Sequence, residues 1–137
     1  MRFNQKYFLL CENATLAKDG KISLINVFDD IYAPKYPATH PLAYFVSNIE
    51  ISDVEKESDI EFSLQINHGS RKKLLPQELK IIKKVVKGNS TVGLIYSISN
   101  LFIPSNGIYS AEINAENKVI CKLTFRADST PPEHINN

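Results

Sequence analysis

The stretch that decides the fold is residues 11–32, CENATLAKDGKISLINVFDDIY, which leads into the proline-rich residues 33–41, APKYPATHP. Within it, Asp19 and Gly20 form a dipeptide that suits a tight turn with positive φ. Runs of apolar and β-branched residues flank this turn, so the stretch predicts two strands, at about 6–13 and 21–32. The three prolines make 33–41 a stiff loop that cannot be a helix.

Turn signals recur along the rest of the chain, with strand-forming runs between them. Further strands are expected at about 42–51, 59–67, 92–103, 108–114 and 119–127. We expect the strands 42–51 and 59–67 to pair with each other. Residues 77–87 fit either a strand, by their β-branched content, or a short helix between Pro76 and Gly88. The pattern predicts an all-β chain folded as a single antiparallel β-sandwich of seven to eight strands, C2-like or immunoglobulin-like.

The length of 137 residues indicates one domain, expected at 1–127, followed by a polar tail at 128–137 that we expect to be disordered. The net charge of +1 supplies no global field that would recruit nucleic acid or an acidic membrane. No run has the features of a signal peptide or the length of a membrane span, so we expect a soluble cytoplasmic protein. Cys11 and Cys121 are then expected as two buried, reduced thiols rather than a disulfide.

Recognisable catalytic and metal-binding motifs are absent from the sequence. It has no Cys-x-x-Cys, no His-x-x-x-His, no glycine-rich phosphate loop and no Gly-x-Ser-x-Gly elbow. We therefore expect a protein that is not an enzyme and that holds neither a cofactor nor a metal.

Charge is distributed unevenly along the chain. Residues 50–61 contain six acidic residues against one lysine, and residues 71–87 contain seven basic residues against one glutamate. Successive turns of an antiparallel sandwich lie at opposite ends. The loops 33–41, 68–77 and 104–107 should therefore share one end, and the turns 18–20, 52–58, 88–91 and 115–118 the other.

The end formed by the loops 33–41 and 68–77 is the candidate binding site. It gathers the predicted partner- or anion-binding residues Lys35, His40, His68, Arg71, Lys72 and Lys73. Two interpretations of His40 stay open: a ring nitrogen that bonds a loop carbonyl and fixes the loop, or a ligand contact made together with His68. Asn26 and Asp30 interrupt an apolar strand face and are expected to satisfy backbone groups or mark a bulge.

A resemblance to a known family rests on several of these segments. They are Glu12-Asn13-Ala14, residues 18–21 (KDGK), residues 25–29 (INVFD), Ile31-Tyr32-Ala33 and residues 36–41 (YPATHP), with LFIP at 101–104 and GIYS at 107–110. Together they resemble a family of small uncharacterised bacterial proteins. The resemblance extends to about Ala127 and implies a compact β-sandwich domain. It carries no established activity, so no catalytic residue is transferred from it.

Three functions remain at this stage. The preferred one is a non-enzymatic interaction module that binds a protein partner or a second copy of itself. The first alternative is an anion- or nucleic-acid-binding domain that uses the loops 33–41 and 68–77. The second is a C2-like calcium or membrane module, in which Asp19 and Glu116 would join Asp53 and Asp59 of the acidic turn.

Overall fold

The computed structural model describes residues 1–69 and 72–130, and only the backbone of Lys72. In this range the chain forms ten strands and no helix. They are β1 (Arg2–Leu16), β2 (Ile22–Phe28), β3 (Asp30–Tyr32), β4 (Ala38–Val54), β5 (Ser58–His68), β6 (Lys72–Lys73), β7 (Leu79–Val85), β8 (Gly88–Ile103), β9 (Gly107–Ala115) and β10 (Lys118–Asp128). The predicted all-β class is confirmed. Because β7 (Leu79–Val85) lies within the ambiguous residues 77–87, the helical alternative there is wrong.

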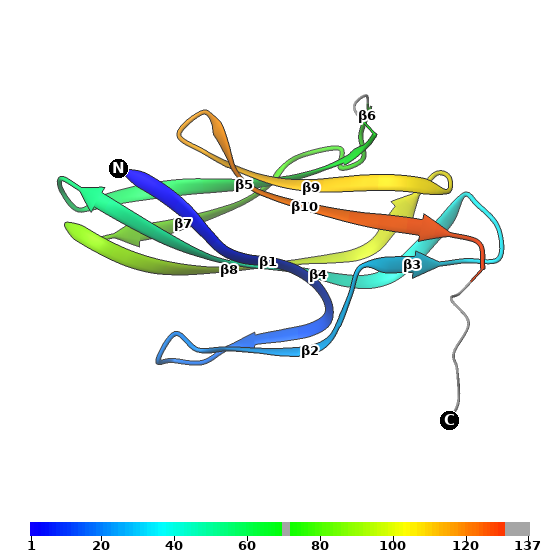
Figure 1. The fold of residues 1–137 in the computed structure, drawn as a ribbon, viewed down its shortest axis with the longest axis horizontal. Helices are drawn as coiled ribbons and strands as arrows, with labels where there is room; N and C mark the ends of the chain where they lie inside the picture. The colour runs from blue at the N-terminus through cyan, green and yellow to red at the C-terminus, as the bar shows by residue number, and fades with distance from the viewer. Residues whose placement is uncertain (70–71, 131–137) are drawn as a thin grey trace.

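The strands form two sheets that pack face to face (Figure 1). The four-stranded sheet has the order β2-β1-β4-β8. The six-stranded sheet has the order β3-β10-β9-β5-β6, and β7 pairs with the same edge of β5 as β6 does. All neighbours are antiparallel except β3 and β10. The predicted sandwich is therefore confirmed, with ten strands instead of seven or eight and one short parallel pair.

The expected pairing of the strands at 42–51 and 59–67 is wrong. β4 pairs with β1 and β8 in one sheet, and β5 pairs with β9, β6 and β7 in the other. Asp53 has a φ of 58°, and the register of β4 shifts between Ile51 and Val54. The chain thus leaves one sheet here and enters the other. Both strands bury alternate residues in the same core, so their sequences alone do not tell a hairpin from a crossover.

The single long strand expected at 21–32 divides at Asp29. β2 stays in the four-stranded sheet, whereas β3 joins β10 of the other sheet. The carbonyl of Asp29 accepts a hydrogen bond from the amide of Arg126 at 2.9 Å, which fixes the crossing point. Asn26 has a φ of 53°, and its side-chain amide donates to the carboxylate of Glu12 at 2.9 Å. This bond joins two side chains, and the register of β1 with β2 is the same on both sides of Asn26, so neither the backbone contact nor the bulge expected of Asn26 is found.

The core lies between the inner faces of the two sheets. Phe45 of β4 is fully buried, and its ring lies 6.5 Å from Phe8 of β1 and 5.9 Å from Phe125 of β10, centroid to centroid. Phe125 in turn stacks on Tyr109 at 5.5 Å. These aromatic side chains join both sheets, and such rings contribute more buried apolar area than any other residue type.

A hairpin arm, residues 12–28, covers part of the outer face of the four-stranded sheet. The arm contributes Ala14, Ile22 and Leu24 to a second apolar cluster, which also contains Val46 of β4 and Ile95 of β8. The side chain of Ile22 lies over Gly93, where an added Cβ would stand 2.8 Å from its Cδ1. Figure 1 shows the arm as a separate layer beneath β1 and β8.

The two ends of the sandwich are arranged as the alternation of turns predicts (Figure 1). At one end the side chains of Asn106 and Ser129 exchange hydrogen bonds at 2.9 and 3.2 Å. At the other end the amide of Asp53 donates to the side chain of Asn89. Asp128 is the last residue of β10, and residues 131–137 of the predicted polar tail lie outside the described residues.

Candidate functional site

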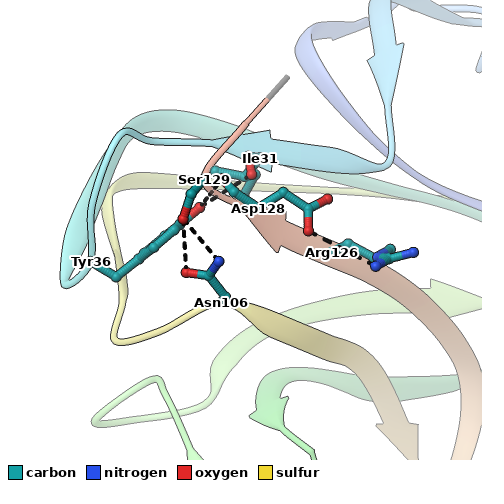
Figure 2. A network of polar contacts seen from close by, with 6 residues as sticks. All are labelled: Ile31, Tyr36, Asn106, Arg126, Asp128 and Ser129. Carbon is teal, nitrogen blue, oxygen red and sulfur yellow. Dashed lines mark hydrogen bonds and ion pairs between the residues drawn. The ribbon is translucent and has the colours of Figure 1, made fainter. Parts of the chain in front are cut away.

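The loop end of the sandwich, residues 33–41, 104–107 and 128–129, is tied together by side chains (Figure 2). The Tyr36 hydroxyl donates to the carbonyl of Asp128 at 2.8 Å and lies 3.3 Å from that of Ile31. Asn106 bonds Ser129, and Arg126 approaches the Asp128 carboxylate at 3.9 Å. Since Asp128 and Ile31 belong to adjacent strands, Tyr36 anchors the proline loop to the edge of the six-stranded sheet.

His40 lies in β4, where it pairs with Leu101 of β8. Its ring packs beside that of Phe28 at 5.7 Å, at the base of the hairpin arm. Burial is the main influence on this ring and lowers the pKa of His40 below its ordinary value of 6.5, against smaller opposing contributions from the Leu42 backbone and Glu12. His40 is therefore a neutral, half-buried packing residue at pH 7.

The lowered pKa of His40 has a consequence for stability. The folded state binds this proton more weakly than the unfolded state, so stability should fall as pH drops through 6.5 towards the folded-state pKa. We expect His40→Gln to unfold at a temperature that depends less on pH than the wild-type temperature does. Thermal unfolding followed between about pH 8 and about pH 5 checks this. Identical pH profiles for both proteins would contradict it.

His68 lies in the other sheet, near the end of β5. Its ring stacks on Tyr109 at 4.3 Å with an interplanar angle of 12°, and its Nε2 lies 3.4 Å from the hydroxyl oxygen of Ser105. Gly107 leaves room for this ring, since a Cβ there would lie 3.2 Å from Nε2. Within residues 1–69 and 72–130, no hydrogen bond or ring contact joins His68 to His40.

The predicted basic residues that the structure describes also lie in different places. Lys35 is exposed in the proline loop, and Lys73 lines a groove that also holds carboxylates. Arg71 and the side chain of Lys72 lie outside the described residues. The anion site therefore stays a prediction, and the described contacts of its two histidines serve packing.

A polar groove lies on the outer face of the six-stranded sheet, with a volume of about 730 Å³. Its floor comes from β5 and β9, which lie side by side with Gln65 opposite Glu112. Figure 1 shows the β9–β10 turn and the segment around β6 rising above this face on either side. The lining residues are almost all polar: Asp59, Glu61, Ser63, Gln65, Asn67, Lys73, Glu78, Glu112, Asn114, Ala115, Glu116 and Asn117.

One rim of the polar groove is held by Gln65, which is only 5% exposed. Its Oε1 accepts hydrogen bonds from the amides of Leu75 at 3.1 Å and Ile66 at 3.0 Å. The amide of Leu74 also donates to the carbonyl of Ile66 at 2.8 Å. These bonds fold the segment after β6 back against β5, and the segment brings Glu78 to the groove.

The floor carries both neutral hydrogen-bonding groups and negative charge. Asn67 donates to the Glu112 carboxylate at 3.3 Å, and Lys80 pairs with Glu61 at 3.2 Å on the surface. The groove counts five carboxylates among its lining residues against the single lysine, Lys73. Such a surface can bind positive charge and offer many hydrogen bonds to an extended chain.

Sequence reasoning missed this groove although its signal was present. The strand 59–67 alternates apolar residues with Glu61, Ser63, Gln65 and Asn67, a pattern that predicts a strand with one polar face but not what lies beside that face. In β9 the polar residues Ser110, Glu112 and Asn114 alternate with Ala111 and Ile113 in the same way. The two polar faces become one groove only because β5 pairs with β9, a long-range contact that alternation does not specify.

The carboxylates proposed for calcium are dispersed. Asp53 pairs with Arg2 at 2.9 Å, and Asp19 pairs with Lys21 at 3.7 Å. Asp59 and Glu116 instead line the polar groove. Among the residues that the structure describes, no three His, Cys, Asp or Glu side chains converge as metal ligands.

The two cysteines are free and buried, as predicted. Burial raises the pKa of the Cys11 thiol and of the Cys121 thiol above the ordinary value of 9.0. Both thiols are therefore protonated at neutral pH, which is the state of a packing residue and not of a nucleophile.

Comparison with known proteins now adds the family. A model of a family of unknown function, DUF6941, matches residues 6–128. The chain belongs to this family. Membership in DUF6941 confirms the resemblance to an uncharacterised family and covers nearly all the described strands. No curated protein matches the chain significantly.

The solved structures to which this DUF6941 member is similar include the crystal structure of β-D-glucoside glucohydrolase from Trichoderma reesei. The TM-score is 0.53 at 10% sequence identity, over 93% of this chain and 19% of that one. The chain thus corresponds to about a fifth of that protein, and the likeness shows the fold alone. Within the described part of the chain, no helix has the length and apolar character needed to cross a membrane.

Proposed function

We propose that this domain is a non-enzymatic interaction module that binds a protein partner through the polar groove. The observation that carries the proposal is the composition of that groove, with five carboxylates and one lysine over about 730 Å³. The partner segment that fits it is an extended chain bearing lysine or arginine. Carboxylates accept charge-assisted hydrogen bonds from such side chains, and these are stronger than bonds between neutral groups.

The protonated thiols and the packed histidines support the non-enzymatic part of the proposal. His40 lies against Phe28, and His68 is stacked on Tyr109. Among the described residues, neither histidine has a thiol or a carboxylate in hydrogen-bond contact with its ring, as a nucleophile–base pair requires. Negative charge in the groove also repels phosphates, which weighs against nucleic acid as its ligand.

The test is capture of partners from the native host by the immobilised chain and by a groove variant, Glu78→Lys with Glu112→Lys. Reversing two groove charges should weaken a specific partner about tenfold or more, because each reversal replaces an attraction with a repulsion. The matched control is Glu55→Lys with Glu57→Lys, which changes the net charge equally in the turn before β5. Quantitative mass spectrometry compares the three captured sets.

A partner lost from the groove variant and kept by the control supports the proposal. Loss from both variants alike would mean that net charge alone attracts the captured proteins. Captured sets that do not change in either variant would overturn the groove as the binding surface. Binding that weakens with added salt in the wild-type chain is also expected, because exposed charges are screened.

A further inference from the structure

We infer that β8 is a self-pairing edge, through which two copies of this chain join their four-stranded sheets. The surface is separate from the polar groove, which lies on the outer face of the other sheet. The inference therefore goes beyond the proposed function and stands or falls independently of it.

The two long sides of the sandwich are closed differently. At one side the sheets are bridged, since the Gln5 side chain of β1 accepts a hydrogen bond from the amide of Lys122 in β10 at 3.1 Å. At the other side lie β8 and β7, each with a neighbouring strand on one edge only among the described residues. Figure 1 shows β7 beside the first part of β8.

Charge distinguishes these two open edges. The seven residues of β7 include Lys80, Lys83 and Lys84, whereas the sixteen residues of β8 include no charged side chain. Lysines on an edge strand are a common protection against pairing with another chain. β7 therefore has this protection, and the longer β8 lacks it.

The central part of β8 is also regular. Its register with β4 is unbroken from Ser90 to Ser99, and the left-handed Asn100, with a φ of 55°, comes only after it. By contrast, the uncharged β2 is interrupted at its centre by Asn26, with a φ of 53°. Among the uncharged edges, β8 thus offers the longer uninterrupted stretch of backbone.

A second copy suits this edge because an antiparallel strand pair is self-complementary about a two-fold axis. Residues 91–99 of each copy, paired two-fold about Ile95 so that core-facing positions lie opposite core-facing ones, would make about ten backbone hydrogen bonds, which is typical of a specific interface. Because β8 has no charged side chain, pairing two copies through it places no like charges on the two β8 strands opposite each other. Lys83 and Lys84 of β7 line a hollow together with residues 91–93 of β8, so antiparallel pairing sets these lysines of the two copies towards opposite ends of the interface.

The buried side chains of β8 need no rearrangement for this pairing. Leu94, Tyr96 and Ile98 remain in the core of their own copy, while Ser97 and Ser99 are exposed on the outer face. The paired sheets would form one continuous sheet of eight strands.

The experiment measures mass by sedimentation equilibrium over a wide range of protein concentration. The full chain should pass from monomer to dimer as its concentration rises. In a two-fold pairing centred on Ile95, residue 91 of one copy lies opposite residue 99 of the other. Thr91→Lys with Ser99→Lys, both at exposed positions, therefore puts like charges opposite each other on β8 and should leave the chain monomeric. Ser23→Lys with Thr124→Lys adds the same charge at exposed strand positions elsewhere and should keep the dimer.

Hydrogen exchange at low and high protein concentration locates the interface between the two copies in the same samples. Those amides within residues 90–99 that point away from β4 should become protected only in the dimer, and the β8 variant should lose that protection while keeping its monomeric fold. A wild-type chain that stays monomeric would overturn the inference, and so would a dimer that persists in the β8 variant. If the chain stays monomeric alone and a host protein pairs with β8 instead, the inference is also overturned.

Discussion

Replacing Phe45 by Ala is expected to lower the free energy of unfolding by about 3–5 kcal/mol, the usual cost of removing a buried phenylalanine. Phe45 is fully buried and links Phe8 of one sheet to Phe125 of the other. The loss is a large share of the roughly 5–15 kcal/mol by which a domain of this kind is stable. Chemical denaturation at equilibrium gives the value.

The matched control is Phe102→Ala, which removes the same side chain from a position that is 52% exposed. We expect this change to cost less than about 1 kcal/mol, because much of the ring already contacts water. Equal losses for Phe45 and Phe102 would contradict the position of the core between the two sheets.

Replacing Tyr109 by Ala is expected to destabilise the fold by about 3–5 kcal/mol, and to loosen the loop end as well. The Tyr109 ring is fully buried between Phe125 and His68. Its hydroxyl donates to the carbonyl of Ser105 at 2.6 Å and accepts from the amide of Ser105 at 3.3 Å. A tyrosine whose hydroxyl bonds the backbone a few residues upstream is a known feature of β-sandwiches, the tyrosine corner.

The Tyr109→Phe variant separates the two contributions of this residue. It keeps the ring but leaves the Ser105 backbone groups without the hydroxyl, so about 1–3 kcal/mol should be lost. Hydrogen exchange at residues 105–107 should accelerate in both variants. If Tyr109→Phe is as stable as the wild type and these amides do not change, the corner has no structural role.

Local chemistry predicted much of the fold. The Asp19–Gly20 turn forms as expected, with a φ of 87° at Gly20, and Gly107 also has positive φ, at 139°. The alternation of Ile60, Phe62, Leu64 and Ile66 correctly identifies a strand with one buried face. Such signals depend on the two-residue period of a strand and on glycine, both of which are local properties.

The same local signals could not predict which distant strands pair with each other. The break at Asp29 and the crossover after Ile51 depend on which sheet receives each buried face, and both sheets are apolar inside. The same limit applies to the two histidines of the candidate site, while the anion site itself stays a prediction. His40 and His68 were placed together because their loops share one end, yet one packs on Phe28 in the first sheet and the other on Tyr109 in the second.

The most direct test of the central claim is an NMR titration of the full chain with octalysine, a defined basic extended probe. The proposed function predicts amide shifts that cluster at groove residues such as Glu61, Gln65 and Glu112, and that are lost in the variant carrying Glu78→Lys and Glu112→Lys. The acidic turn at residues 52–58 serves as an internal comparison. Shifts concentrated in that turn, or spread evenly over all exposed carboxylates, would contradict the groove as the partner-binding surface.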